Sequence, residues 1–499
     1  MERRNIAGAL FGFASGLAIS EEKAYAQSCS TAPSMGPLYP LATGETSSIV
    51  TNYCYPPYNV CRYGADATGT QDSGPAFSAA MSIPGVDVSI PPGIFKIAQN
   101  LTPRCASIRG AGSIPLTGSL LKPTSAVTTL LSITSSGGNY PEYMGHFSID
   151  GTAAPSGTGI VMGDQGGAVH ADLANVEIGN FSGSGGIGLK VVDTIQTWVR
   201  HCYIFGCGTN LVVSGDSGFP TTTMFEQSEF DDATVAQGCL VQSGTDIVFN
   251  QCIFQSNAME GFKASPGQSI SCSNIVLNQC YFENNYNSNN YHFVADGSAS
   301  GCILRVRLSE PQFQTSTATA RAANCTGANC DVIMRSPVFA TGLPNNIVYQ
   351  NGAFGRIDQW DNWWSYPALV SDSAGKVIGW DGSLTNYSPT ISVPAGSISG
   401  VSISLARWRR VGVHMLLVEL NFSGTTTGSP NWLQASIPSG FTLQGTAVRV
   451  PCLVTDGGLE QPGACLTDGT TNLRLYKTNS VLFGAGDCGG SIQLLLEVL

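Results

Sequence analysis

The sequence predicts an all-β protein in which a single-stranded parallel β-helix is followed by a C-terminal β-sandwich domain. Three observations support this fold class. A short phrase recurs about every 26 residues through the middle of the chain, a period that indicates a solenoid. Charged residues are only 11% of 499 and Gly accounts for 59, which suits many tight turns and argues against a helical protein. After residue 386 the alternating strands become longer, as in a sandwich.

The repeated phrase lies between Leu173 and Asn285 and ends each time in an apolar residue. A repeat of this length buries its apolar face only by stacking on its neighbours, so we expect these residues to form an inward column. They are separated by steps of 26, 26, 24 and 28 residues, at Ile178, Ile204, Phe230, Phe254 and Phe282.

The composition of the repeat distinguishes a β-helix from other solenoids. In 247–254 and 275–282, a short alternating strand is followed by Asn-Gln and then by a second short strand. The apolar side chains share one face only if this pair forms a corner, and Asn suits a corner because it tolerates the left-handed conformation. A leucine-rich repeat is disfavoured, since its consensus and any helix between the strands are missing.

The first 26 residues have the pattern of an export signal. A charged start at Met1–Arg4 precedes an apolar run at Ile6–Ile19, and Ala24-Tyr25-Ala26 offers a cleavage site. We therefore expect residues 1–26 to be a signal peptide and the protein to be secreted, extracellular or periplasmic; a disordered start or a buried helix is the alternative. Arg3-Arg4 leaves twin-arginine export open beside the ordinary route. Membrane insertion is not expected, because the apolar run is short for a bilayer.

Cysteines are numerous, and all 16 follow the predicted cleavage site. In an exported chain they favour disulfides. Cys252 and Cys280 occupy the same inward position on successive turns, where strands about 4.8 Å apart permit a disulfide. The alternative is a ladder of free thiols that fill the core as small apolar groups. The other expected pairs are Cys54 with Cys61, Cys325 with Cys330, and two of Cys452, Cys465 and Cys488.

The chain between the signal and the repeats contains a lead-in and a short helix. Residues 27–58 are rich in Ser, Thr, Pro and Tyr, and we expect an extended lead-in there. The helix is predicted to begin at a cap formed by Asp72 or Ser73, with Pro75 in its first turn.

Three motifs occur around this helix: Tyr63-Gly64-Ala65-Asp66 with Gly69 and Asp72, then Ile90-Pro91-Pro92-Gly93-Ile94-Phe95, then Ile108-Arg109-Gly110-Ala111-Gly112. In this order and at this spacing they resemble the opening of pectate-lyase-superfamily proteins, which are related to family 28 glycoside hydrolases and include tailspike depolymerases. With the repeats, the resemblance covers residues 60–355. It implies a right-handed parallel β-helix, plugged at its N-terminal end by the helix at 72–83, and an extracellular carbohydrate as the ligand class.

The catalytic motifs of these relatives are missing. Family 28 hydrolases carry Asn-Thr-Asp, Asp-Asp, Gly-His-Gly and Arg-Ile-Lys in order, and only Asp231-Asp232 is present here. The acidic calcium-binding runs and the Trp-Ile-Asp-His phrase of pectate lyases are also absent, as is the Gly-x-Ser-x-Gly of esterases. No Cys-x-x-Cys occurs, which disfavours a zinc site or a thioredoxin-like function. We expect no metal and no other cofactor.

Candidate site residues come from the outward positions of the repeated strands. If the closing apolar residues point inward, the residues on either side of them point outward. These positions combine aromatic rings, which can stack on a sugar ring, with carboxylates that can bind hydroxyls or transfer protons. The residues before the apolar position, the first outward column, are Glu177, Tyr203, Glu229, Ile253 and Tyr281. The residues after it, the second outward column, are Gly179, Phe205, Asp231, Gln255 and Glu283.

Three carboxylates in these columns, Glu229, Asp231 and Glu283, are the candidate catalytic residues. Glu229 and Asp231 are roughly 7 Å apart along one strand, and Asp231 and Glu283 are roughly 10 Å apart across two turns. Inverting glycosidases place their carboxyl groups about 6.5–9.5 Å apart, so an inverting pair suits this spacing better than a retaining pair. A plain solvated surface is the alternative. The candidate substrate-binding residues are Tyr203, Phe205, Gln255 and Tyr281.

The β-helix is expected to occupy residues 59–366, with a linker at 367–385 and the β-sandwich at 386–499. Three Trp within 360–364 either close the open end of the solenoid or form a sugar platform. The segment Arg407-Trp408-Arg409-Arg410 and its surroundings resemble the C-terminal sandwich domains of phage tail fibres and tailspikes, which often trimerise or bind sugar.

Three functions stay open at this point. The first is a secreted enzyme that cuts a polysaccharide, with hydrolysis favoured over β-elimination. The second is a non-catalytic glycan-binding or adhesion protein, and the third is a prophage-type spike that forms a homotrimer. The signal segment favours the first two and the C-terminal domain the third. The expected partner is a polysaccharide or glycan, and the net charge of −11 without a basic run argues against nucleic acid.

Overall fold

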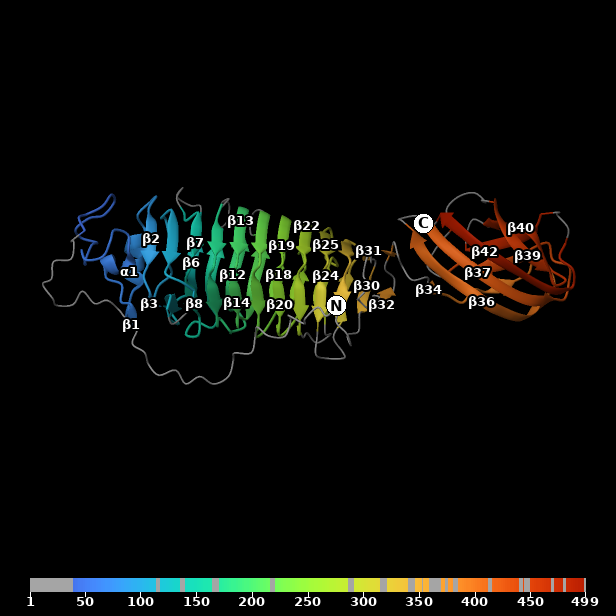
Figure 1. Ribbon diagram of the computed structural model, residues 1–499, viewed down its shortest axis with the longest axis horizontal. Coiled ribbons are helices and arrows are strands. Elements are labelled where there is room, and N and C mark those ends of the chain that lie inside the picture. Colours follow the sequence, from blue (N-terminus) through green and yellow to red (C-terminus); the bar gives the residue numbers. More distant parts are fainter. Residues whose placement is uncertain are drawn as a thin grey trace, which may run out of the picture.

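The computed structural model describes residues 39–497 except 114–116, 135–139, 164–169, 216–219, 286–290, 315–320, 340–345, 352, 359–368, 373–375, 380–384, 412–414, 439–442, 444–448, 468–470 and 479–481. The predicted signal peptide and the tryptophan cluster lie outside these residues. A parallel β-helix is followed along the chain by an antiparallel sheet (Figure 1). Within the described ranges, no helix is long and apolar enough to cross a membrane.

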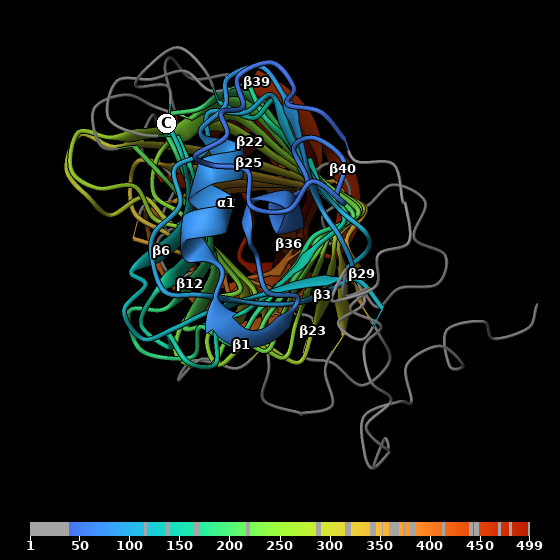
Figure 2. The same ribbon diagram turned by 90° about the vertical axis from the view of Figure 1, so that its left-hand side faces the viewer.

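Each turn in the middle of the β-helix contributes one short strand to each of three parallel sheets, and among the described residues the turns at the two ends contribute fewer. Along a turn the chain passes from the first sheet to the second and then to the third, as in β13 (Ile195–Arg200), β14 (Tyr203–Phe205) and β15 (Thr209–Ser214). The end-on view shows the strands of successive turns stacked behind one another (Figure 2). The β-helix predicted from the repeat and from the family resemblance is therefore confirmed.

The strands of the three sheets have the following bounds among the described residues. The first sheet contains β2 (Asp87–Ile90), β4 (Ser107–Gly110), β7 (Tyr143–Gly145), β10 (Asp172–Ala174), β13, β16 (Thr221–Glu226), β19 (Gly244–Asn250), β22 (Ser271–Asn278), β25 (Ile303–Ser309), β28 (Cys330–Arg335), β31 (Phe354–Asp358) and β33 (Lys376–Gly379). The second contains β1 (Thr68–Asp72), β3 (Gly93–Ile97), β5 (Ser119–Pro123), β8 (Ser148–Asp150), β11 (Glu177–Gly179), β14, β17 (Glu229–Asp231), β20 (Ile253–Gln255), β23 (Tyr281–Glu283), β26 (Gln312–Gln314) and β29 (Val338–Phe339). The third contains β6 (Thr129–Ile133), β9 (Thr158–Met162), β12 (Ile187–Val192), β15, β18 (Cys239–Val241), β21 (Phe262–Ala264), β24 (Tyr291–Asp296), β27 (Arg321–Thr326), β30 (Asn346–Gln350) and β32 (Leu369–Asp372).

The apolar residues that close the repeats form the predicted inward column. Phe230 pairs with Phe254, and Phe254 with Phe282, in the second sheet, and all three are fully buried. The ring centroid of Phe254 lies 5.3 Å from that of Phe230 and 5.1 Å from that of Phe282, with nearly parallel planes. Because strands stack about 4.8 Å apart, equal side chains at one position lie ring on ring. Each turn therefore depends on both neighbours for its burial.

The corner between the first and second sheets lies at the predicted Asn-Gln pair. Asn250 and Asn278 end strands β19 and β22, and the left-handed backbone occurs one residue later, with φ of 53° at Gln251 and 50° at Gln279. The Asn-Gln pair therefore forms the predicted corner, but its left-handed residue is Gln and not Asn. Gln251 Nε2 donates to Gln279 Oε1 at 3.1 Å, and Gln227 Nε2 donates to Gln251 Oε1 at 2.9 Å. The amides of successive turns thus satisfy one another, which offsets the strained backbone.

A second, buried amide ladder lines the corner between the second and third sheets. Asn257 Nδ2 donates to Asn285 Oδ1 at 2.8 Å, and Asn210 Nδ2 donates to Asn257 Oδ1 at 3.2 Å. All three side chains are fully buried. An unsatisfied buried amide is costly, so this ladder holds the turns in one register. The repeat pattern of the sequence does not predict this ladder.

The short helix α1 (Gly74–Met81) covers the N-terminal end of the β-helix, with the 3-10 turn η1 (Val60–Tyr63) beside it (Figure 2). Phe77 is fully buried, and its ring lies 5.3 Å from that of Phe95. Ser73 occupies the cap position without a side-chain cap bond, whereas Asp72 Oδ1 accepts from the first helical amide at 2.9 Å. The predicted plug is confirmed.

Most cysteines of the described residues are buried packing residues, and Cys54 is exposed. All those in the described part of the chain are free thiols, so the predicted disulfides, between Cys252 and Cys280 and in the other pairs, are absent there. Cys252 and Cys280 are fully buried, and their thiols donate to the carbonyls of Phe225 and Phe249 at 3.4 and 3.5 Å. Cys252 and Cys280 therefore match the alternative interpretation, in which free thiols fill the core as small apolar groups.

The C-terminal unit is antiparallel and has its own core. Its described strands form one continuous sheet in the order β34-β36-β37-β42-β39-β40-β41-β38-β35. Phe422, Leu433 and Leu475, from different parts of this sheet, are buried in one cluster, so the sheet closes over its own apolar face. The bounds are β34 (Thr385–Asn386), β35 (Ile391–Ser392), β36 (Ile398–Val411), β37 (Met415–Thr426), β38 (Leu433–Ser436), β39 (Arg449–Asp456), β40 (Leu459–Thr467), β41 (Asn472–Lys477) and β42 (Gly486–Glu497).

Candidate functional site

The two outward columns of the second sheet are in register, as the repeat predicts. The first column aligns Tyr203, Glu229, Ile253 and Tyr281 on successive strands. The second aligns Phe205, Asp231, Gln255 and Glu283. All seven candidate site residues therefore lie on one face of β14, β17, β20 and β23.

Glu229 and Asp231 form an acidic pair that is withdrawn from solvent. They are two residues apart on β17, which places their Cα atoms roughly 7 Å apart. Glu229 is half-buried, and Asp231 is only 7% exposed. Burial, together with the charges of Asp231 and Asp232, raises the pKa of Glu229 to about 7. Glu229 can therefore hold and release a proton near neutral pH.

The two oxygens of Asp231 have different surroundings. The hydroxyl of Tyr203 donates to Oδ2 at 3.0 Å. Oδ1 is buried and has no hydrogen-bond partner among the residues that the structure describes. An unsatisfied buried acceptor costs about 1–3 kcal/mol, and more when it is charged, so Oδ1 is expected to accept from a water or a ligand hydroxyl. Burial and the charge of Asp231 raise the pKa of Tyr203, which keeps its hydroxyl protonated as a donor.

A flat aromatic surface adjoins the acidic pair. The rings of Tyr203 and Phe205 stack with centroids 4.7 Å apart and planes inclined by 13°. Gly179, in the same column one turn earlier, leaves room for the Phe205 ring, because an added Cβ there would lie 2.4 Å from Phe205 Cζ. Because the rings stack on each other, the pair offers a sugar its outer ring faces and edges.

Glu283 lies two turns further along the second column, with Gln255 between it and Asp231. The hydroxyl of Tyr281 lies 3.1 Å from Glu283 Oε2 and 2.7 Å from Gln314 Oε1. Its single proton is shared between these two acceptors. A tyrosine hydroxyl thus accompanies each of the two carboxylates of the second column.

Two histidines of the repeat region hydrogen-bond to side chains of the two amide ladders. His292 is 1% exposed, burial lowers its pKa to about 4, and its Nδ1 lies 3.3 Å from Asn285 Nδ2 at the end of the buried ladder. His201 is exposed at a corner, with Nε2 2.7 Å from Gln227 Oε1. Within the described ranges, no three acidic, His or Cys side chains are grouped as metal ligands.

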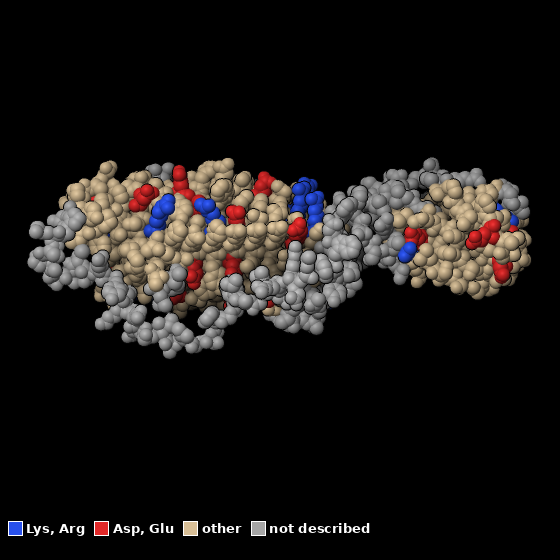
Figure 3. All heavy atoms as spheres, in the orientation of Figure 1, with Lys and Arg blue, Asp and Glu red and all other residues tan. Residues whose placement is uncertain are grey.

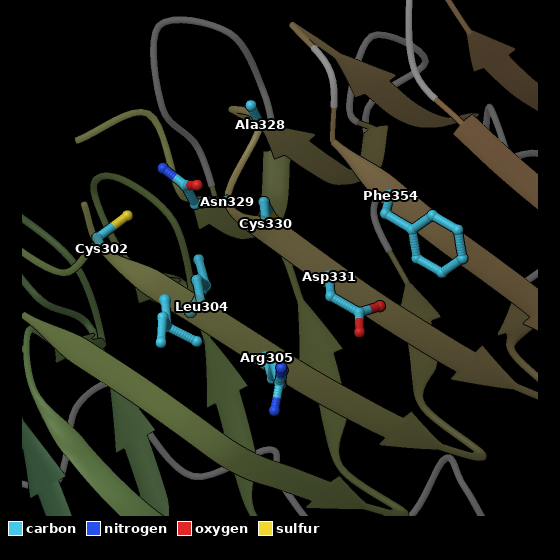
Figure 4. Close-up of a pocket in the computed structure, with 9 residues that line it drawn as sticks. Cys302, Leu304, Arg305, Ala328, Asn329, Cys330, Asp331 and Phe354 are labelled. Carbon is cyan, nitrogen blue, oxygen red and sulfur yellow. The ribbon is translucent and has the colours of Figure 1, made fainter. Parts of the chain in front are cut away.

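Hollows with described linings lie on the other two faces of the β-helix. One of 470 Å³ on the third sheet is lined by Lys190, Leu240 and the buried hydroxyls of Ser214 and Ser243. Two lie on the first sheet, one of 280 Å³ (Figure 4) and one of 390 Å³, and both are lined by Arg305 and Asp331. Asp331 could not be recognised from the sequence, because a single Asp in an alternating strand is usually an ordinary solvent-exposed residue.

The comparisons with known proteins concern the fold. No protein-family model and no curated protein matches the chain. Similar solved structures include the Dettilon tailspike protein, with 12% identity, a TM-score of 0.48, and coverage of 88% of this chain and 94% of that chain. Full-length tailspike protein 2 from an Escherichia coli O157:H7 bacteriophage has 11% identity, a TM-score of 0.49, and coverage of 87% and 64%. The alginate lyase of a Paenibacillus strain has 15% identity, a TM-score of 0.40, and coverage of 55% and 95%. Because the sequence identities and TM-scores are low, the fold is assigned from the strand pairing of this chain and not from these structures.

Proposed function

We propose that this protein binds an extracellular polysaccharide along the outward columns of the second sheet and hydrolyses it. The observation that carries the proposal is the pair of Glu229 and Asp231, two neighbouring carboxylates in different environments. Pairs of titratable groups whose surroundings separate their roles are typical of acid–base catalysis. The stacked rings of Tyr203 and Phe205 would hold a sugar beside this pair.

We expect an inverting hydrolysis, because Cα atoms roughly 7 Å apart on β17 leave room for a water between the two side chains. Glu229 would donate its proton to the glycosidic oxygen as the bond to the anomeric carbon breaks. A water held at Asp231 Oδ1 would attack that carbon from the other side and give its proton to Asp231. Glu283 is the alternative base, and Gln255 and Tyr281 would bind the chain further along the columns.

The reaction type is tested with a panel of bacterial and plant polysaccharides. We expect new reducing ends without absorbance from unsaturated ends, because hydrolysis leaves no double bond. The panel is run with wild type, Glu229→Gln, Asp231→Asn and Glu283→Gln. Unsaturated products would show that the reaction is β-elimination and not hydrolysis. Unchanged activity in all three variants would show that these carboxylates are not the catalytic site.

The pH dependence follows from the raised pKa of Glu229. Its proton is lost as the pH rises through about 7, so kcat/KM is expected to fall above that pH. Asp232→Asn should move this fall in kcat/KM to lower pH, because the charge of Asp232 helps to raise the pKa of Glu229. If kcat/KM fell at the same pH in Asp232→Asn as in the wild type, the assignment of Glu229 as the general acid would be contradicted.

The stability of the folded protein depends on the same group. The ordinary Glu pKa of 4.5 is raised to about 7 in the folded state, so Glu229 stabilises the protein fully below pH 4.5 and less as the pH rises through 7.

A second candidate function, a trimeric glycan-binding spike, is favoured by apolar side chains on the C-terminal sheet. Val401 and Ile403 on β36, and Leu453 and Leu459 on β39 and β40, are 39–74% exposed. Exposed apolar groups of this kind favour self-association. Light scattering of the purified chain is expected to give three times the chain mass of 52.1 kDa. A monomer would exclude the spike but not the hydrolase.

A further inference from the structure

The last turns of the β-helix carry a group of side chains that the proposed hydrolytic site does not use. Arg305, Asp331 and Phe354 are register partners on three consecutive strands of the first sheet. Figure 4 shows them on adjacent strands around one hollow. Arg307 lies two residues from Arg305 and lines the second hollow with Asp331.

The two arginines make no direct ion pair or ring contact of the kind that other arginines of this sheet make, although both act electrostatically on Asp331. Arg200 pairs with Asp172, and Arg109 lies over the ring of Tyr143 at 4.3 Å. Arg305 and Arg307 are exposed, and in the described part of the chain neither guanidinium has an ion pair or hydrogen bond. Figure 3 shows basic side chains gathered near this end of the β-helix. The chain as a whole has a net charge of −11, so Arg305 and Arg307 form a local positive patch that can attract an anion.

Asp331 adds a second requirement. Its Oδ1 is buried and has no hydrogen-bond partner among the described residues. Burial raises the pKa of Asp331, although Arg305 and Arg307 oppose the shift. A ligand that supplied only an anion would leave this oxygen unsatisfied. A ligand with hydroxyl groups beside its anionic group would satisfy both the guanidinium groups and Oδ1.

Phe354 supplies the third element. It is half-buried and borders Asp331 in the hollow of 280 Å³. A flat ring beside hydrogen-bonding groups suits a ligand with one apolar face and polar edges. The three strands place ring, carboxylate and guanidinium about 4.8 Å apart in succession, so an extended ligand lying across the turns meets all three.

From this arrangement we infer a second saccharide-binding site on the first sheet, formed by Arg305, Arg307, Asp331 and Phe354, that takes a sugar bearing an anionic group. The arginines bind the carboxylate or sulfate, Asp331 accepts from a ring hydroxyl, and Phe354 stacks on the ring. DNA offers phosphates but no hydroxyl beside them, so it meets only part of the site. The inference rests on the proposed function, since it specifies the class of polysaccharide.

The site is tested by calorimetric titration in the full-length Glu229→Gln background, which prevents cleavage. The probes are hexamers of galacturonate, mannuronate and guluronate, a sulfated galactan hexamer, the methyl ester of the galacturonate hexamer, inorganic sulfate and single-stranded DNA. At least one acidic hexamer is expected to bind, and the uronate and sulfate arms identify its anionic group. Removal of that charge should weaken binding about tenfold or more.

Variants distinguish this site from general charge effects. Arg305→Gln and Arg307→Gln should each weaken binding of the acidic hexamer about tenfold, and Phe354→Leu and Asp331→Asn should weaken it severalfold. Lys263→Gln, which removes a charge on the third sheet, should leave it unchanged. No binding of any acidic hexamer, equal binding of the esterified form or DNA, or unchanged affinity in both arginine variants would overturn the inference. Cleavage that depends on Glu229 would persist in that case, so the two proposals can fail separately.

Discussion

Glu229→Gln is expected to lower the rate of polysaccharide cleavage about 100- to 10,000-fold, the usual contribution of a general acid. Gln has nearly the same shape and can hydrogen-bond, but it cannot transfer a carboxyl proton. The half-buried position of Glu229 and the charges of Asp231 and Asp232 raise its pKa to about 7, so the wild-type residue is protonated when it is needed. The measurement is kcat on the polysaccharide that the panel identifies, at a pH below 7.

Glu177→Gln is the matched control for this prediction. Glu177 lies in the same outward column two turns earlier and is half-buried, and burial alone raises its pKa. It has no carboxylate partner equivalent to Asp231, because Gly179 occupies that position. We expect less than a threefold change in kcat, a difference of about 0.6 kcal/mol in the barrier. An equal loss in both variants would show that any buried carboxylate of the column matters, and the acid assignment would fail.

Phe254→Ala is expected to lower the free energy of unfolding of the β-helix by about 3–5 kcal/mol. Phe254 is fully buried, and its ring stacks between Phe230 and Phe282. Its removal leaves a cavity that the neighbouring turns cannot close, because their spacing is set by backbone hydrogen bonds. Denaturant unfolding followed by circular dichroism measures the loss.

Ile253→Ala controls for position in the same strand. Ile253 is the adjacent residue of β20 and points outward, half-buried. We expect a loss of roughly 1 kcal/mol, since little buried apolar area is removed. If the two variants were equally destabilised, the inward column would not be the main source of stability in these turns.

The stacked architecture could be predicted from sequence because it follows from local periodicity. The closing residues from Ile178 to Phe282 define the inward column, and alternation then places Glu229 and Asp231 outward on one strand. The register of Tyr203 with Glu229, and of Phe205 with Asp231, follows from the same repeat, since a slip of one residue would expose every apolar side chain.

Other features needed the tertiary structure. The left-handed corner at Gln251 rather than Asn250 depends on an amide from the next turn, and the free thiol of Cys252 depends on a carbonyl of the preceding turn. The grouping of Arg305, Asp331 and Phe354 depends on three strands separated by more than twenty residues each. The repeat period is visible when the sequences of successive turns are compared, without knowledge of their contacts. Hydrogen-bond partners, burial and the pKa of Glu229 arise between turns, where the lengths of the connecting loops decide which side chains meet.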